Sequence, residues 1–185
     1  MFGQLLAQLA RELKSLGFPY MVIGGQAVLI HGEPRFTRDI DVTLGTNPES
    51  LPRLLKAILT IGWKPLPSDP VSFVQETLVL PCEDPKTGIR LDFIFGLTAY
   101  EMDAISRSIP IFFEGVPVQV ASMEDLVISK IIAGRPRDLE DVMGILAKNP
   151  QLNKKMASEI LANFGRELNE PLAERFEEIW NKSRQ

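Results

Sequence analysis

Cysteine and histidine are nearly absent from this chain of 185 residues, which contains one of each. The single cysteine, Cys82, excludes an internal disulfide, and with one histidine the chain cannot assemble a Cys/His zinc site. A chain with so few cysteines fits a reducing compartment best. We therefore expect a cytoplasmic protein.

Long apolar runs and long runs of one charge are also absent. The first stretch, MFGQLLAQLARELKSLGF, has Arg11, Glu12 and Lys14 among its apolar positions, which predicts an amphipathic helix and neither a signal peptide nor a membrane span. With 20 basic and 24 acidic residues, the formal net charge is -4, which does not favour general binding to nucleic-acid phosphates. We expect no membrane partner.

Apolar residues are present in quantity: they make up 45% of the chain, which is enough to bury one substantial core. Apolar spacing and turn residues predict, in order, a helix over 5–16, a strand over 20–23, a helix over 26–30, a strand over 39–44, a helix over 47–62, strands over 72–80 and 89–95, a helix over 99–107, and strands over 109–113 and 116–120. Ser122 with Asp125 predicts a helix start, and helices fill the remainder. The phenylalanines at strand positions, Phe93, Phe95, Phe112 and Phe113, are predicted core residues.

These elements predict an α+β fold with a mixed β-sheet flanked by helices. The predicted division is a core over residues 1–121 and a helical C-terminal extension over 122–185, packed on that core.

The chemistry-bearing stretch is GGQAVLIHGEPRFTRDIDVTL. Asp39 and Asp41 are two apart on a strand, so their carboxylates point to one face, close enough to bind one or two divalent ions. Gly24 and Gly25, between a strand and a helix, allow close approach of a phosphate, and the helix offers free N–H groups and the positive end of its dipole. The segment predicts a phosphate cradle beside a pair of metal ligands.

A third carboxylate, Asp92, lies in the β-forming run Arg-Leu-Asp-Phe-Ile-Phe, where it is a poor choice for a central strand. If this strand lies beside that of Asp39 and Asp41, three carboxylates converge on a pair of metal ions, as in displacement at phosphorus. The alternative is a structural ion pair between Asp92 and Arg90.

These residues resemble the nucleotidyltransferase superfamily, which has the DNA polymerase beta-like fold and the signature Gly-Gly or Gly-Ser, Asp-x-Asp and a distal Asp. The later segment, SMEDLVISKIIAGRPRDLEDV, resembles members grouped with the abortive-infection toxins of toxin-antitoxin systems. The resemblance implies transfer of a nucleoside monophosphate from a nucleoside triphosphate, such as ATP, to a hydroxyl of a protein, a transfer RNA or a small molecule. It also implies two Mg²⁺ ions, with Mn²⁺ as an alternative, and an antitoxin protein as partner.

The resemblance assigns roles to individual residues. Asp39 and Asp41 would bridge the metals, and Asp92 would hold the metal that activates the acceptor and accept its proton. Lys130 is a candidate contact for the triphosphate, against the alternative of a solvated lysine, and Arg38 would neutralise phosphate charge. Gln26 departs from the members with serine in the turn, so backbone donors would have to suffice there.

Several alternatives accompany this hypothesis. Asp39-Ile-Asp-Val-Thr-Leu also resembles the first motif of haloacid-dehalogenase-type phosphatases, but that motif requires an apolar strand before its first Asp, whereas residues 33–38 form a polar loop. A non-catalytic nucleotide-binding or antitoxin-like protein is the second alternative; three retained, mutually repulsive carboxylates disfavour it. Asp138 and Asp141 are expected only to complement the dipole of their helix.

Overall fold

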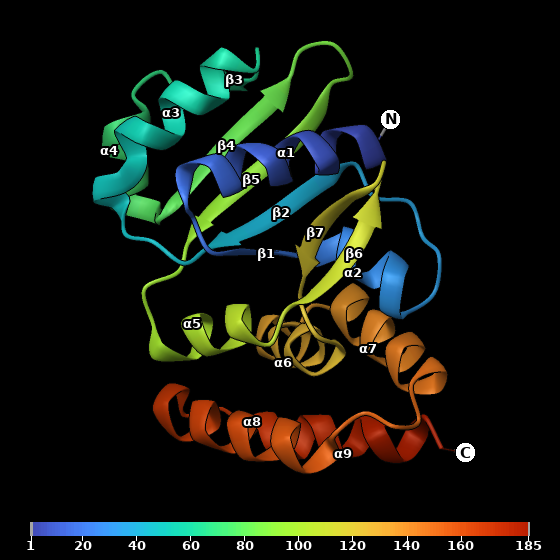
Figure 1. Cartoon of the computed structure of the whole chain (residues 1–185). Coiled ribbons are helices and arrows are strands. Elements are labelled where there is room, and N and C mark those ends of the chain that lie inside the picture. Colours follow the sequence, from blue (N-terminus) through green and yellow to red (C-terminus); the bar gives the residue numbers. More distant parts are fainter. Residues whose placement is uncertain (1, 185) are drawn as a thin grey trace. The chain divides into compact units, whose positions relative to one another are not determined.

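The computed structural model of the chain describes residues 2–184, which divide into two compact units (Figure 1). The first unit contains the residues up to 26 and residues 36–121, and the second contains residues 27–35 and those from 122 onward. The segment 27–35, in the middle of the predicted core, thus groups with the C-terminal helices. The predicted packing of the extension on the core stays a prediction.

The first unit is built on one mixed sheet. Parallel pairing joins β2 to β5 and β1 to β7, and the other neighbouring strands are antiparallel, which confirms the predicted mixed sheet. In the order β3-β4-β5-β2-β1-β7-β6, the strands are β1 (Tyr20–Ile23), β2 (Asp39–Leu44), β3 (Lys64–Pro65), β4 (Val79–Asp84), β5 (Ile89–Phe95), β6 (Ile109–Phe113) and β7 (Val116–Val120).

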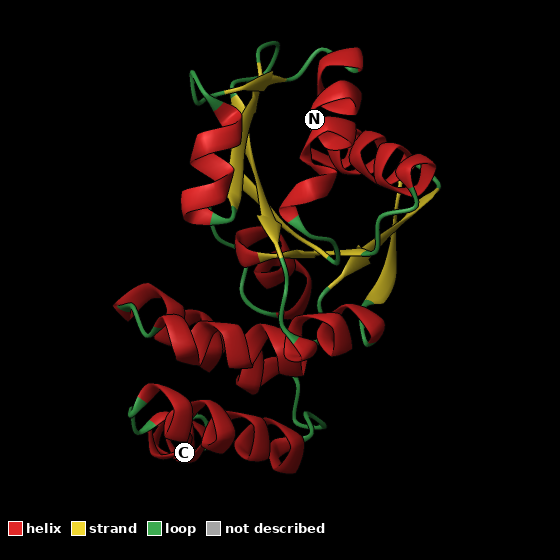
Figure 2. Ribbon diagram, turned by 90° about the vertical axis from the view of Figure 1, so that its left-hand side faces the viewer, coloured by secondary structure: helices red, strands yellow, loops and turns green. Residues whose placement is uncertain are grey.

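Helices lie on both faces of this sheet, which Figure 2 shows nearly edge-on. The first unit contributes α1 (Phe2–Leu16), α3 (Leu51–Thr60) after a short 3-10 turn, α4 (Pro70–Thr77) and α5 (Ala99–Ser106). The apolar face of α1 is buried as its spacing predicts, and the helix ends at Gly17, whose positive φ of 69° suits glycine.

The second unit is helical, as predicted. It holds α6 (Met123–Ala133), α7 (Pro136–Lys148), α8 (Lys154–Leu168) and α9 (Leu172–Lys182). Ser122 accepts a hydrogen bond from the Asp125 N–H at the start of α6, which confirms the predicted cap. The helix after the glycine pair, α2 (Gly24–His31), contains residues of both units and begins at Gly24, two residues earlier than predicted. Across residues 2–184, no helix has the length and apolar character needed to span a membrane.

The predicted strand over residues 72–80 is wrong, because most of it forms α4. The β-forming composition of this run is overridden by a strong helix start: the Asp69 carboxylate accepts hydrogen bonds from the N–H groups of Val71 and Ser72, and Pro70 occupies the first turn. The helix ends at Leu78 in the left-handed conformation. The predicted hairpin with β5 exists, but its first strand begins at Val79.

One face of the central strands β2 and β5 forms the core. Ile40, Val42 and Leu44 alternate with the polar positions of β2, and Leu91, Phe93 and Phe95 do so on β5; all six are at most 2% exposed. The predicted core positions of Phe93 and Phe95 are therefore confirmed. Phe112 on the edge strand β6 is 69% exposed, so its predicted burial is wrong.

Candidate active site

The register of β2 and β5 brings the three predicted carboxylates to one face of the sheet. Asp41 pairs with Asp92 across the parallel strands, and Asp39 pairs with Arg90. Because paired residues on neighbouring strands point to the same face and the strands are about 4.8 Å apart, Asp41 and Asp92 stand side by side. Asp39 lies two residues earlier on the same face. Three acidic residues that are separate in the sequence thus lie near one another on one face of the sheet.

The environment of Asp92 is unusual for a carboxylate. Burial raises the pKa of Asp92, the nearby Arg90 opposes this rise, and the negative charge of Asp39 adds to it. Among residues 2–184, its buried Oδ1 atom accepts no hydrogen bond, and the Arg90 Nη2 atom lies 3.7 Å from it. The alternative structural role of Asp92, an ion pair with Arg90, is present in the structure, although its 3.7 Å separation is longer than a hydrogen bond.

Gly24 lies directly beneath the Asp41 carboxylate. A Cβ atom built on Gly24 would lie 1.8 Å from Asp41 Oδ2, and the backbone there has a positive φ of 63°. Steric clash and backbone conformation therefore both require glycine at this position. The phosphate-cradle turn and a carboxylate of the cluster are in direct contact, which the sequence motif alone does not establish.

Two polar side chains accompany the turn, and the sequence analysis gave neither of them a role. A Cβ atom on Gly25 would lie 2.3 Å from the Thr37 hydroxyl, so this hydroxyl sits against the turn. Gln26 is 6% exposed, and its Nε2 has no hydrogen-bond partner among residues 2–184. The threonine lies 12 residues beyond Gly25 and becomes its neighbour only through the path of the intervening loop, so no local pattern reveals it.

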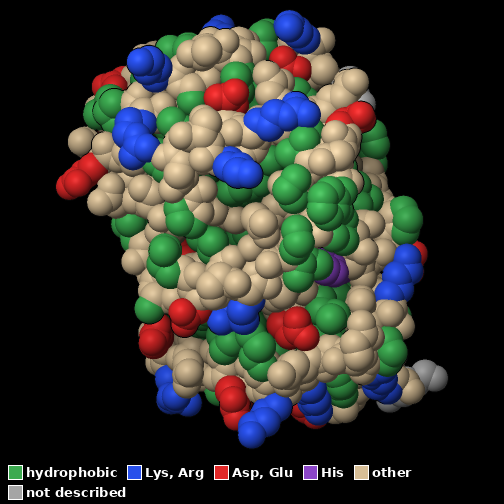
Figure 3. Space-filling view, viewed as in Figure 1, with side chains coloured by type: hydrophobic (Ala, Val, Ile, Leu, Met, Phe, Trp, Pro, Cys, Tyr) green, Lys and Arg blue, Asp and Glu red, His purple; other side chains and the backbone are tan. Residues whose placement is uncertain are grey.

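Arg38 is exposed beside Asp39 at the start of β2, and its guanidinium stands 5.2 Å from the ring centroid of Phe36. Phe36 itself is 73% exposed. An aromatic ring and a cation therefore stand together on the loop that leads into the carboxylate strand. The basic residues do not form a continuous band on the face seen in Figure 3, where they alternate with acidic and neutral side chains.

Lys130 belongs to the second unit and is 6% exposed, so the alternative of a solvated lysine is wrong. Its Nζ lies 2.7 Å from Asp138 Oδ1 and 2.8 Å from Asp141 Oδ2. Arg35 holds Asp141 through both of its oxygens, and Arg135 bonds Asp138. Burial acts to raise the pKa of Asp138, but hydrogen bonds from Arg135 and Lys130 hold it below its ordinary value.

This buried ion cluster corrects the expectation for Asp138 and Asp141. Both residues are at most 7% exposed, and they pair with cations besides lying in the first turns of α7. An aspartate that merely complements a helix dipole would stay in solvent. The Lys130 ammonium is already paired with two carboxylates. These contacts do not test its role as a nucleotide ligand, which stays a prediction.

The carboxylate cluster has the donor set of a hard divalent cation. Asp92 offers a buried oxygen with no partner, and its raised pKa reflects burial and the neighbouring Asp39, a burden that a cation would relieve. As the side chains stand, no three His, Cys, Asp or Glu residues within the described range 2–184 are arranged around a common metal position. The backbone register places Asp39, Asp41 and Asp92 on one face of the sheet, and a metal site at these residues stays a prediction.

The sequence of residues 4–185 matches the family described as nucleotidyl transferase AbiEii toxin, type IV TA system. The chain belongs to this family and is a nucleotidyltransferase, which confirms the predicted resemblance and enzyme class. No curated protein matches it.

Solved structures share the fold. The antibiotic-resistance factor ANT(2'')-Ia is similar with a TM-score of 0.64 and 17% identity, covering 90% of this chain and 92% of that one. ANT(2'')-Ia in complex with adenylyl-2''-tobramycin gives a TM-score of 0.62 and 16% identity over 90% and 98% of the two chains. An antigenic nucleotidyltransferase-like protein from Paracoccidioides brasiliensis gives 0.56 and 16%, over 95% and 91%. The predicted nucleotidyltransferase fold is thereby confirmed.

Proposed function

We propose that this member of the AbiEii family transfers a nucleoside monophosphate from a nucleoside triphosphate to an acceptor hydroxyl, with Mg²⁺ held by Asp39, Asp41 and Asp92. The observation that carries the proposal is the contact between Gly24 and the Asp41 carboxylate, together with the pairing of Asp41 and Asp92. A phosphate bound at the turn would lie beside the carboxylates. A cation between the two is then needed to separate like charges.

The triphosphate is assigned to the turn at Gly24 and Gly25 and to the free N–H groups at the start of α2. Thr37 supplies the hydroxyl that serine supplies in other members of the superfamily, since its Oγ1 stands against Gly25. Gln26 adds a buried amide donor that has no hydrogen-bond partner in the described range 2–184. The exposed guanidinium of Arg38 neutralises phosphate charge from the neighbouring loop.

In the proposed reaction, the acceptor oxygen forms a bond to the α-phosphorus while the bond from this phosphorus to the bridging oxygen breaks, and pyrophosphate leaves. The hydroxyl proton passes to the Asp92 carboxylate. Bound Mg²⁺, or Mn²⁺ in its place, would neutralise the triphosphate and lower the pKa of the acceptor hydroxyl.

The family description places such chains among toxins, and we propose that this protein is the toxin of a toxin-antitoxin pair with an antitoxin protein as partner. ANT(2'')-Ia has been solved with an adenylylated small molecule. Proteins, transfer RNA ends and small hydroxylated molecules all remain acceptor candidates for this chain. The formal net charge of -4 favours an acceptor with a small contact area over a long RNA duplex.

The test is transfer of label from each of the four α-³²P-labelled nucleoside triphosphates to cell-extract components, with Mg²⁺. Asp41→Asn keeps the shape of the side chain and removes its charge, so we expect loss of transfer with a nearly unchanged circular dichroism spectrum. Asp103→Asn, at an exposed position of α5, is the matched control and should retain the wild-type rate. Equal transfer by Asp41→Asn and wild type would refute the catalytic assignment. Mass spectrometry of labelled products identifies acceptor and nucleotide together.

A further inference from the structure

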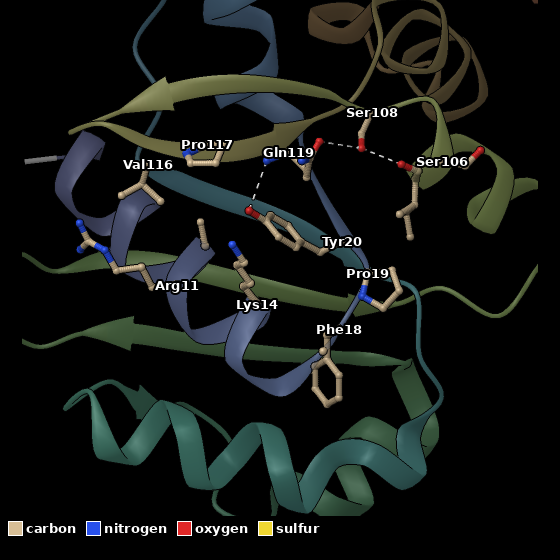
Figure 4. A pocket seen from close by; sticks show the side chains of 13 residues that line it. Arg11, Lys14, Phe18, Pro19, Tyr20, Ser106, Ser108, Val116, Pro117 and Gln119 are labelled. Atoms are coloured by element: carbon tan, nitrogen blue, oxygen red, sulfur yellow. Dashed lines mark hydrogen bonds between the residues drawn. The ribbon is translucent and has the colours of Figure 1, made fainter.

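A cavity of the first unit shares no lining residue with the proposed active site. It has a volume of about 650 Å³ and lies among α1, the start of β1, the end of α5 and the β6–β7 hairpin (Figure 4). This volume is within the range of about 300–1,000 Å³ found for small-molecule sites. Its lining residues are Ala10, Arg11, Lys14, Gly17, Phe18, Pro19, Tyr20, Ile105, Ser106, Ser108, Val116, Pro117 and Gln119.

The lining combines cations with an apolar floor. Arg11 and Lys14 are exposed on successive turns of α1, and no acidic residue lines the cavity, although the whole chain carries a net charge of -4. Val116 and Pro117 of the β6–β7 hairpin contribute apolar surface to the same cavity. The lining therefore favours a ligand with a negative group and an apolar body.

A buried donor also points to a ligand. Tyr20 is 6% exposed, and its hydroxyl accepts a hydrogen bond from the Gln119 backbone N–H at 3.2 Å. In the part of the chain that the structure describes, no acceptor is recorded for the proton of this hydroxyl, which burial keeps in place by raising the pKa of Tyr20. In Figure 4, Lys14 and Tyr20 point toward the same part of the cavity from α1 and β1. One hydroxyl and one ammonium are thus available to a single acceptor group.

We propose that this cavity binds a small organic anion, an aryl or alkyl carboxylate or phosphate, whose charged group contacts Arg11, Lys14 and the Tyr20 hydroxyl. The site is separate from the proposed catalysis. Side chains alternate along β1, and Ile23 is the residue paired with Asp41, so Tyr20 points to the sheet face opposite the carboxylate cluster. A ligand here would bind without occupying the nucleotide position.

Phenyl phosphate, phenylacetate and neutral benzyl alcohol are the probes, titrated into ¹⁵N-labelled full-length protein and followed by two-dimensional NMR. We expect saturable shifts of the amides of Gly17, Phe18 and Tyr20, of residues 106–108, and of Val116, Val118 and Gln119 with either anion. Binding of benzyl alcohol should be about tenfold weaker, as loss of charge-assisted hydrogen bonds predicts. Tighter binding of phenyl phosphate identifies a phosphate site, and tighter or equal binding of phenylacetate a carboxylate site. Shifts of these amides that are absent, or equal affinity for benzyl alcohol, would overturn the proposal.

Variants locate the contacts. The double variant Arg11→Gln and Lys14→Gln should weaken anion binding about tenfold or more, and Tyr20→Phe, which keeps the ring, should weaken it severalfold. Lys155→Gln, at a side chain that is 85% exposed on α8, is the matched control and should bind as the wild type does. If the double variant binds the anions as tightly as this control, the site is not an anion site.

Discussion

Replacement of Gly24 by alanine tests the contact between the glycine turn and the carboxylate cluster. The added methyl group would start 1.8 Å from Asp41 Oδ2, far inside van der Waals contact, so either the carboxylate or the turn must move. A displacement of about 1 Å in a catalytic group costs on the order of 100-fold in rate. We expect Gly24→Ala to reduce nucleotide transfer by at least this factor.

The same replacement also strains the backbone, and a matched glycine separates the two effects. Gly88, in the turn between β4 and β5, has a φ of 69°, close to the 63° of Gly24, and a Cβ atom there meets nothing within 4 Å. The left-handed conformation costs alanine about 1–2 kcal/mol at either position. Gly88→Ala should therefore lose similar backbone stability while retaining transfer, and the difference between the variants isolates the clash with Asp41.

Three measurements decide the outcome. Thermal unfolding compares the stabilities, where a loss of about 1–2 kcal/mol lowers the melting temperature by a few degrees for a chain of this size. Calorimetry with Mg²⁺ and each of the four nucleoside triphosphates compares binding, and the label-transfer assay compares rates. If Gly24→Ala binds and transfers like Gly88→Ala, the turn does not position a phosphate against Asp41, and the reasoning fails.

Three further predictions concern single side chains. Because Asp92 has a raised pKa in the folded protein, its ionisation costs stability as the pH rises through that value; Asp92→Asn should raise the metal-free free energy of unfolding at pH 7 by about 0.5–2 kcal/mol and abolish stabilisation by Mg²⁺. Lower stability than wild type in urea titration at pH 7 would contradict this. Lys130→Met leaves Asp138 and Asp141 without their shared cation and should cost about 3–5 kcal/mol by the same titration, whereas a cost below about 1 kcal/mol would show that the cluster is not structural. Thr37→Val should weaken Mg²⁺-nucleotide binding about tenfold in calorimetry, and unchanged affinity would remove its hydroxyl from the phosphate site.

The central sheet follows from local sequence because its strands carry strong, regular patterns. The alternation of Asp39, Ile40, Asp41 and Val42 predicts β2 with its polar face, and the turn at residues 84–88 predicts the hairpin of β4 and β5. The prediction of a strand over residues 72–80 is wrong because two local signals conflict there. Its β-forming residues suggest a strand, but Asp69 and Pro70 just before it start a helix, and the cap decided the outcome.

From the sequence, the contacts of the site can be predicted only between residues that are a short distance apart in the chain. The alternation along a strand predicts that Asp39 and Asp41 share a face, and the superfamily signature selects Asp92. The contact of Thr37 with Gly25 depends on the path of a loop, and the pairing of Lys130 with Asp138 and Asp141 on how two helices pack. No periodicity encodes such contacts. A lone lysine on an apolar helix face therefore looks solvated or ligand-binding in sequence, when its partners are eight and eleven residues away.

The chain has one acidic grouping at Asp138 and Asp141 and another on the sheet that includes Asp92. They differ in how far the protein itself neutralises their negative charge. This difference distinguishes a structural ion cluster from a candidate functional site. Asp138 and Asp141 are buried and pair with the buried Lys130 and with two more exposed cations, Arg35 and Arg135, so their charge is neutralised by the protein itself. On the sheet, the Asp92 Oδ1 atom is buried with no hydrogen-bond donor among residues 2–184, beside the negative charge of Asp39, and its ion pair with Arg90 is 3.7 Å long. This weaker compensation of Asp92, next to the glycine turn, favours an external cation at the second grouping. The nucleotide would bring its own negative charge to the same place, so metal and triphosphate should bind cooperatively, each more tightly in the presence of the other.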